Sequence, residues 1–251
     1  MTAASGAHPE LIRCPGHPGA GVAHVHVVAA ALAADAKAGI AHGGILAHHS
    51  PMISVVVLAA GKSTRMGGRT KALLRLAGGD TFVCRIVRTF LEAGLEEIVI
   101  VAGHEAGRVV SAVARDDLGA RVVVNELFET GQLSSVLAGL RAVDRPEVEA
   151  MMLTLVDVPM VSAATVRAVI QRYRDTRAPI VRPVRGALHG HPVLIDRRLF
   201  RALRDADPEE GAKPVVRAHV SDAGDVAVED PGAFADVDTG DDYERLVKTT
   251  S

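Results

Sequence analysis

The residues most able to do chemistry form a loop of small side chains that carries three cations. The loop runs from Leu58 to Gly68 and is followed by Lys71. Its glycines permit positive φ angles, and its small side chains allow backbone N–H groups to approach phosphate oxygens. Lys62, Arg65 and Lys71 add positive charge within ten residues. This combination predicts a binding site for a triphosphate.

The loop follows a short apolar segment. In the run from Ser54 to Leu58, every residue after the serine is apolar and most are β-branched, which is typical of a strand covered on both faces in a parallel sheet. The cationic loop therefore starts at the carboxyl end of that strand. Ligands of open α/β sheets bind at this end.

Two common phosphate motifs are excluded by the spacing of the glycines. Gly61-Lys62-Ser63 looks like the end of a P-loop, but the glycine that a Walker motif needs is replaced by Val56. The dinucleotide fingerprint G-x-G-x-x-G also fails, because Ser63 stands where its second glycine should be. A glycine-rich turn without a ligand is the simpler alternative. Three cations so close together favour nucleotide binding.

At this point the chain resembles a known family. Its pattern from Leu58 to Gly67, with Lys71 beyond, matches L-A-[AG]-G-x-S-x-R-M-G followed by a lysine. That pattern is similar to the molybdenum cofactor nucleotidyltransferases, a branch of the superfamily that includes the sugar-nucleotide pyrophosphorylases. Ala60 resembles the cytidylyltransferase branch, since the guanylyl branch typically has glycine at this position. The resemblance extends from Met52 to the end of the chain.

The rest of the chain alternates between expected strands and helices. Strands are expected over 97–101, 121–124, 151–156, 180–183, 192–195 and 234–237, and helices over 81–93, 106–115, 133–142, 163–174, 197–203, 214–219 and 243–247. This alternation predicts an α/β protein with a largely parallel sheet. The change of order after Pro179 predicts an antiparallel insertion. The resemblance implies a three-layer α/β/α, Rossmann-like nucleotidyltransferase fold over residues 52–251.

One acidic residue ends an apolar strand. Asp157 follows Leu153–Val156 and precedes Val158-Pro159, so its carboxylate should face the same edge of the sheet as the cationic loop. There it could hold Mg²⁺ against nucleotide phosphates. The resemblance gives Asp157 this role as a metal ligand. The alternative is an Asx-turn or a cap for the helix that starts near Ala163.

A second acidic group lies near the carboxyl end of the chain. The segment from Asp236 resembles the family pattern [ND]-[IV]-[ND]-T-P-E-D, with Gly240 where proline is usual. Mg²⁺, or Mn²⁺ as the alternative ion, takes few protein oxygens, and Asp238 is favoured over Asp236 as the second ligand. Thr239 and Asp242 should form a capping box for the last helix.

Further polar residues open a helix after the strand at 121–124. Gln132, Ser134 and Ser135 resemble the family motif G-x-S-S-S. Hydroxyls and free N–H groups at a helix N-terminus can bind a base edge, a ribose or an anion, although an ordinary N-cap would use the same residue types. Asn125, in the loop before them, is a further candidate for the nucleotide.

A histidine motif stands in the variable half of the family. Gly190, His191 and Pro192 match a G-H-P motif near the acceptor site. We expect His189 and His191 to alternate on one strand and point to one side. A zinc site is disfavoured, because no third ligand lies nearby. His191 is assigned either to the acceptor or to the core.

The resulting hypothesis is nucleotidyl transfer. The resemblance implies that CMP passes from CTP to the terminal phosphate of molybdopterin with release of pyrophosphate, and that Arg65, Lys71 and Asp157 are the catalytic residues. Guanylyl transfer, transfer to a sugar phosphate and non-catalytic cofactor handling are the alternatives. The residues assigned to the nucleotide are Leu58, Ala59, Ala60, Gly61, Lys62, Ser63, Arg65, Lys71, Asn125, Gln132, Ser134 and Ser135.

The composition of the chain restricts its partners and its compartment. The 251 residues carry a net charge of −2, which disfavours binding to nucleic acid. The two cysteines form no framework, as expected in a reducing cytoplasm. Residues 1–51 hold seven of the eleven histidines and no aromatic residue. We expect a flexible leader, in keeping with a start codon assigned too early, and no membrane span. A molybdenum hydroxylase or its chaperone would receive the product.

Overall fold

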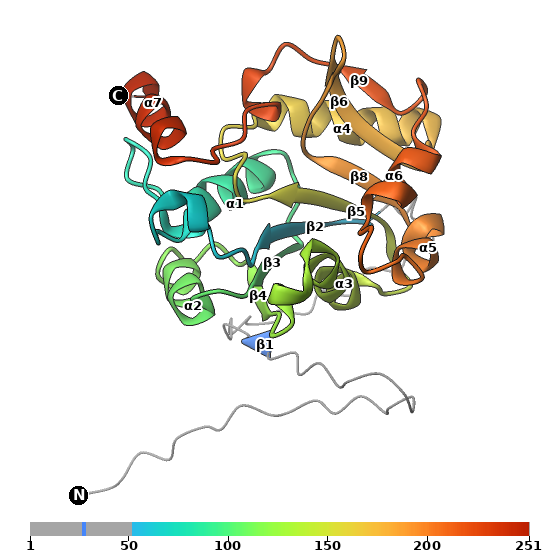
Figure 1. Ribbon diagram of the computed structural model, residues 1–251. Coiled ribbons are helices and arrows are strands. Elements are labelled where there is room, and N and C mark those ends of the chain that lie inside the picture. Colours follow the sequence, from blue (N-terminus) through green and yellow to red (C-terminus); the bar gives the residue numbers. More distant parts are fainter. Residues whose placement is uncertain (1–26, 29–51, 251) are drawn as a thin grey trace, which may run out of the picture.

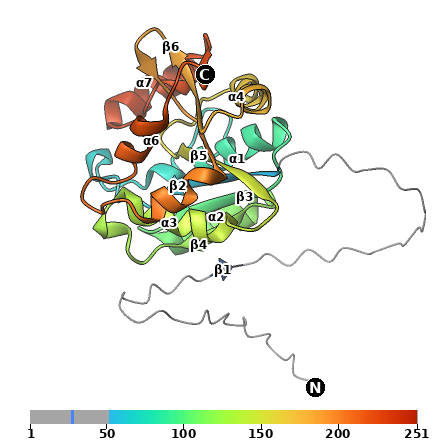
Figure 2. The same cartoon turned by 90° about the vertical axis from the view of Figure 1, so that its right-hand side faces the viewer.

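The computed structural model describes residues 27–28 and 52–250 of the chain (Figure 1). A single mixed sheet lies between helices on its two sides, and the view turned by 90° shows the same layers (Figure 2). The three-layer α/β/α fold predicted from the sequence is confirmed.

The parallel half of the sheet contains four strands in the order β4 (Arg121–Val124), β3 (Ile98–Ala102), β2 (Met52–Ala59) and β5 (Val148–Leu155). The chain leaves β2 toward β3 and β4, and it then returns to the other side of β2 to form β5. The strand order therefore reverses between β2 and β5. In open α/β sheets this reversal opens a crevice at the carboxyl ends of the strands.

The remaining strands form the antiparallel insertion that was expected. β8 (Val193–Asp196) lies antiparallel to β5, and β6 (Ile180–Arg185) lies antiparallel to β8. β7 (Leu188–His189) closes a hairpin with β6, and β9 (Asp225–Ala227) pairs with β6 in parallel. At the opposite edge, β1 (Val27–Val28) pairs antiparallel with β4.

Strand β2 separates two hydrophobic cores. Val55 and Val57 belong to one core, whereas Val56 and Leu58 belong to the other, because successive side chains of a strand point to opposite faces. The helices that bury the first core are α1 (Phe82–Glu92), α2 (Ala106–Arg115) and α4 (Ala163–Thr176), and those that bury the second are α3 (Gln132–Val143), α5 (Phe200–Arg204) and α6 (Lys213–His219). Both faces of β2 are therefore covered, as its apolar sequence predicts.

One expected strand does not form. Residues 234–237 follow a 3₁₀ turn, η5 (Pro231–Ala233), and are irregular. Their surroundings bond to loops instead of to a strand, since the His191 amide donates to the Ala233 carbonyl and the Val237 amide donates to the Asp157 carbonyl, each at 2.8 Å. The apolar residues of this segment therefore did not signal a strand, because its neighbouring backbone groups bond to loops.

The last helix is longer than the sequence suggested. α7 spans Gly240–Thr250, and its capping box is confirmed. The Thr239 amide donates to Asp242 Oδ2 at 2.8 Å, and the Asp242 amide donates to Thr239 Oγ1 at 3.2 Å. These hydrogen bonds lower the pKa of Asp242 to about 2. The box fixes the point at which the chain turns from the sheet edge into the helix.

Other expectations concern the cysteines and the leader. Cys84 is a buried core residue, and burial raises the pKa of its thiol to about 11. Over the part of the chain that the structure describes, no helix is both long and apolar enough to cross a bilayer. Apart from β1, the interpretation of residues 1–51 as a leader falls outside the described residues.

Close packing of α3 on β2 makes a stability prediction. A Cβ on Gly139 would lie 2.3 Å from Val56 Cγ1, so Gly139→Ala should destabilise the fold by about 1–3 kcal/mol through overpacking. Gly107→Ala is the matched helical control, because a Cβ there meets nothing within 4 Å. It should be neutral or stabilising by up to about 1 kcal/mol. Urea unfolding measures both, and equal stability of the two variants would contradict the packing argument.

Candidate active site

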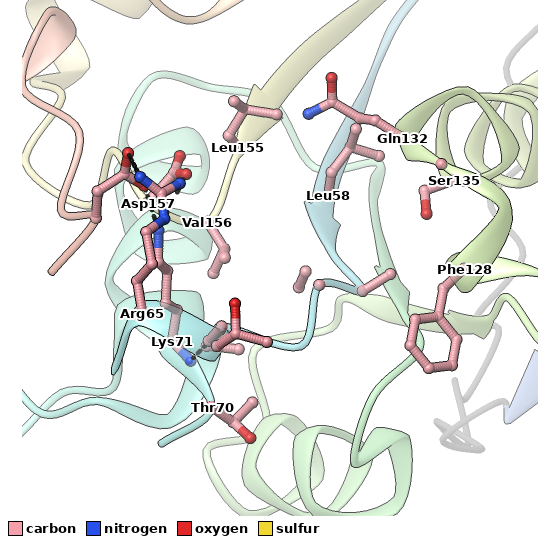
Figure 3. A pocket seen from close by; sticks show the side chains of 18 residues that line it. Leu58, Arg65, Thr70, Lys71, Phe128, Gln132, Ser135, Leu155, Val156 and Asp157 are labelled. Carbon is pink, nitrogen blue, oxygen red and sulfur yellow. Dashed lines mark hydrogen bonds and ion pairs between the residues drawn. The ribbon is translucent and has the colours of Figure 1, made fainter. Parts of the chain in front are cut away.

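A cavity of about 330 Å³ opens at the carboxyl ends of β2 and β5 (Figure 3). This is the place where the strand order reverses. Its lining consists of Leu58, Ala59, Ala60, Gly61, Ser63, Thr64, Arg65, Thr70, Lys71, Ala72, Phe128, Gly131, Gln132, Ser135, Leu155, Val156, Asp157 and Asp238. The cationic loop and the residues just after it, up to Ala72, thus supply about half of the wall, and segments from three other parts of the chain supply the rest.

The cationic loop is shaped by backbone that turns through positive φ angles. Ser63 has φ 52°, and Gly67 and Gly68 have φ 63° and 81°. Between them the single turn η1 (Thr64–Met66) directs Met66 into the core, where it is 1% exposed, and leaves Arg65 exposed at the cavity. Ser63 Oγ accepts a hydrogen bond from the amide of residue 71 at 3.2 Å, which joins the two ends of the loop.

The Lys71 ammonium lies between two carboxylates. Its Nζ is 2.7 Å from Asp238 Oδ1 and 3.5 Å from Asp157 Oδ2. Arg65 Nη1 is 3.1 Å from the other oxygen of Asp238. The hydrogen bond from Lys71, with the charges of Lys71 and Arg65, lowers the pKa of Asp238. Figure 3 shows Arg65, Lys71 and Asp157 clustered at one end of the cavity.

The two acids reach this cluster from distant positions in the sequence. Asp157 follows the end of β5, and Asp238 lies in the irregular segment before α7. The hydrogen bond from the Val237 amide to the Asp157 carbonyl joins the two segments directly. The expectation that Asp238 follows a strand is wrong, because this hydrogen bond positions it instead of a strand end.

The acids fit a divalent cation that has few protein ligands. Asp157 Oδ1 is buried and has no hydrogen-bond partner, so one carboxylate oxygen is open to a ligand. Within residues 52–249 no group of three or more histidine, cysteine or acidic side chains could hold a metal ion by itself. A cation such as Mg²⁺ would therefore need oxygens from a substrate or from water, which is its usual habit in phosphate sites.

Asp236 and His191 lie just behind the cluster. Neither lines the cavity. Partial desolvation and the negative charge of Asp157 raise the pKa of Asp236. Burial lowers the pKa of His191, whose Nδ1 is buried without a partner.

His189 is exposed on β7, whereas His191 lies beyond the strand. The prediction that these two histidines share a strand is therefore wrong. Gly190 and Pro192 are buried beside His191 and also stand outside the lining.

The opposite end of the cavity is formed by the first turn of α3 and the segment just before it. Gln132 and Ser135 line it, together with the half-buried Phe128. Asn125 and Ser134 do not line it. Asn125 Nδ2 instead donates to the hydroxyls of Ser134 and Ser135, at 2.9 and 3.0 Å, and Ser134 donates to the Leu127 carbonyl. These two residues hold the loop in shape.

Lys62 is the cation that the structure separates from the other two. Its Nζ lies 2.5 Å from Glu129 Oε1 on the turn η3 (Phe128–Thr130), and Lys62 does not line the cavity.

The sequence did not point to several lining residues, namely Thr64, Thr70, Ala72, Phe128, Gly131, Leu155 and Val156. Of these, Phe128 carried a usable signal, since an aromatic side chain between a strand and a polar helix start is uncommon in a chain with 3% aromatic residues.

The charge cluster makes a prediction about protonation. Lys71→Met removes the main cause of the low pKa of Asp238, so this pKa should rise toward its ordinary value. In the wild type the Asp238 carboxylate should thus stay charged to lower pH than in the variant. NMR titration of ¹³C-labelled aspartate side chains measures the shift. Lys62→Met is the control, because Lys62 pairs with Glu129. A pKa of Asp238 that is the same in all three proteins would contradict the arrangement.

Two curated proteins are similar to this chain in sequence. Nicotine blue oxidoreductase of Paenarthrobacter nicotinovorans is 31% identical over 204 residues, which are 78% of this chain and 97% of that protein. The bifunctional protein GlmU of Clavibacter sepedonicus is 33% identical over 129 residues. The chain spans only 26% of the length of that GlmU.

Solved structures show the same fold. Rv0371c of Mycobacterium tuberculosis is 32% identical with a TM-score of 0.66, and 79% of this chain and 98% of that one are covered. A nucleotidyl transferase from Methanothermobacter thermautotroptrophicus (Mth528) has a TM-score of 0.67 at 26% identity, with 80% of this chain and 98% of that one covered. A family model described as the MobA-like NTP transferase domain matches residues 55–223, which is well over half of the chain. The protein belongs to the MobA-like NTP transferase family, and the resemblance inferred from the cationic loop is confirmed.

Proposed function

We propose that this protein transfers CMP from CTP to the terminal phosphate of a molybdopterin-type cofactor and releases pyrophosphate. The observation that carries the proposal is the convergence of Lys71, Arg65, Asp157 and Asp238 at one end of the cavity. Membership of an NTP transferase family supports the reaction class. The nucleobase and the acceptor are inferred from resemblance.

The cationic loop would bind the triphosphate. Arg65 and Lys71, which line the cavity, would hold the β- and γ-phosphates and stabilise the leaving pyrophosphate. Ala59, Ala60, Gly61 and Ser63 line the cavity beside them, where backbone N–H groups can donate to phosphate oxygens. An oxygen of the acceptor phosphate attacks the α-phosphorus of CTP, and the bond from that phosphorus to the bridging oxygen of pyrophosphate breaks. The acceptor oxygen is already ionised, so no general base is required.

Asp157 and Asp238 would hold Mg²⁺ or Mn²⁺. Asp157 offers the buried, unpartnered Oδ1, and Asp238 lines the cavity. A bound divalent cation would neutralise charge on the phosphates. A manganese complex of Rv0371c, 30% identical to this chain with a TM-score of 0.61, supports the use of such an ion. Asp236, close to Asp157 and outside the lining, is the weaker candidate ligand.

The site would exchange ionic partners when the nucleotide binds. In the structure both oxygens of Asp238 face cations, Oδ1 toward Lys71 and Oδ2 toward Arg65. An incoming triphosphate carries more negative charge than one carboxylate and would attract both cations. Asp238 would then be released to bind the metal. Nucleotide and metal are therefore expected to favour each other's binding.

Selection of the base and the acceptor rests on fewer residues. Ala60 lines the cavity, and alanine at this place resembles the cytidylyl branch. A CMP-2-keto-3-deoxy-manno-octonic acid synthetase solved with CTP shares the fold alone, at 17% identity and a TM-score of 0.60. Gly190, His191 and Pro192 lie behind Asp157, and we assign them to the acceptor side. A molybdenum hydroxylase, or a chaperone of one, would take the product.

Pyrophosphate release tests the proposal. The full chain is incubated with each of the four NTPs, Mg²⁺ and molybdenum-loaded cofactor, and pyrophosphate is measured. We expect release with CTP. Release with GTP alone would favour the guanylyl alternative, and release only when a sugar phosphate replaces the cofactor would favour that acceptor. Absence of pyrophosphate with every NTP and acceptor would refute an enzymatic role.

Acidic variants test the proposed ligands in the same assay. Asp157→Asn should lower turnover by at least about a hundredfold, because it removes a charged metal ligand and keeps the side-chain shape. Asp238→Asn should have a similar effect, whereas Asp236→Asn should have a smaller one. Asp241→Asn, an exposed acid in the first turn of α7, is the control. Near-normal turnover of the Asp157 variant would return Asp157 to a structural role.

A further inference from the structure

We propose that Phe128 stacks on the base of the bound nucleotide and sets much of the affinity for it. The inference rests on the proposed function, since it requires that a nucleotide occupies the cavity. Three features of the molecule support it, namely the two different ends of the cavity, the packing behind the Phe128 ring and the hydrogen bonds that fix its loop.

The cavity has two chemically different ends. Arg65, Lys71 and Asp157 lie at one end, and Phe128 lies across the cavity from them (Figure 3). Figure 3 shows Gln132 and Ser135, both from α3, on the Phe128 side. A nucleotide whose triphosphate meets the cations must extend its base toward the aromatic end. There it would find a π-face with two hydrogen-bonding side chains nearby.

The ring is supported from behind by a glycine. A Cβ on Gly103 would lie 2.6 Å from Phe128 Cγ and 2.8 Å from the Ala60 carbonyl oxygen. Only a residue without a side chain lets Phe128 pack this closely against the end of β3. The His104 ring also contacts Phe128, with centroids 6.3 Å apart and planes tilted by 47°. These contacts hold one side of Phe128, while the ring still lines the cavity.

The turn that carries Phe128 is fixed from both directions. Asn125 Oδ1 accepts a hydrogen bond from the Leu127 amide at 3.1 Å, and Ser134 Oγ donates to the Leu127 carbonyl at 2.8 Å. The next residue, Glu129, forms the ion pair with Lys62 of the cationic loop. The aromatic end and the phosphate end of the cavity are thereby tied together. Little side-chain entropy remains to be lost when a base stacks on the ring.

Stacking has a consequence that separates it from recognition of the base edge. Every nucleobase presents a π-face, so the contact is tolerant of base identity. Removal of the ring should thus weaken CTP and GTP by similar factors. Inorganic tripolyphosphate has no base, and its binding should not respond.

The experiment uses the full chain and exploits the absence of tryptophan from the sequence. Phe128→Trp creates a single fluorescent reporter in the cavity wall. With Mg²⁺ present, CTP should quench its emission and tripolyphosphate should not. Calorimetry with Phe128→Leu should show about tenfold weaker binding of CTP and of GTP, the size expected for loss of one stacked base, and unchanged binding of tripolyphosphate. Leu127→Ala, an exposed neighbour outside the cavity lining, is the control and should bind as the wild type does.

Different results would overturn the stacking of Phe128 and the proposed function. If the wild type binds no nucleotide at all, the proposed function fails and this inference falls with it. If the wild type binds CTP while Phe128→Leu binds it equally well, only the stacking inference is overturned. Equal weakening of CTP and tripolyphosphate would also overturn it, because the substitution would then act through the shape of the loop. Quenching together with selective weakening of the nucleotides supports it.

Discussion

The site depends on one arrangement of charge, in which the ammonium of Lys71 lies between the carboxylates of Asp157 and Asp238. The Lys71 side chain is only 11% exposed. A cation that is so nearly buried persists only when it is paired and hydrogen-bonded, and here the two acids supply that pairing. Neither acid lies near Lys71 in the sequence. The cluster therefore exists only in the folded chain, and the fold must bring three segments to one point.

The topology of the sheet accomplishes this. β2 and β5 are neighbours with parallel direction, so the loops that follow them begin side by side at one edge. The third segment arrives from the carboxyl end of the chain without forming a strand. It is attached by the backbone hydrogen bond between Val237 and Asp157, and the capping box of Thr239 and Asp242 then turns it into α7. The hydrogen bond and the capping box fix the backbone of this segment. The side chains of Asp157 and Asp238 remain directed at the cations.

The sequence predicts those features that depend on neighbouring residues. The apolar run of β2 and the small residues after it are contiguous, and the βαβ alternation follows from local periodicity. The strand expected at 234–237 did not form, because the backbone around it bonds to loops from distant parts of the chain, and local sequence does not reveal such partners. Phe128 was overlooked for a similar reason. Its place in the cavity wall depends on the missing Cβ of Gly103, at the end of a different strand.

The same limit applies to the polar residues before α3. Asn125 was a candidate for the nucleotide because it lies in the same loop, but the residue is 3% exposed and its side chain is bonded within that loop. Its contribution would be to hold η3, and with it Phe128. Gln132 and Ser135 share the same motif and do reach the cavity. Only the direction of each side chain separates the two groups, and this direction depends on how α3 packs on the sheet.

In the proposed site the triphosphate competes with Asp238 for Lys71 and Arg65, and the released carboxylate of Asp238 then binds the metal. The most direct test of this exchange is the affinity of the protein for Mn²⁺, measured by water-proton relaxation without nucleotide and with saturating CTP, after correction for Mn²⁺ bound to free CTP. Because Lys71 and Arg65 engage both oxygens of Asp238 before the nucleotide binds, the account predicts weak binding of Mn²⁺ to the protein alone. With CTP the protein-bound Mn²⁺ should increase by about tenfold or more in affinity. Equal affinity with and without CTP would contradict it.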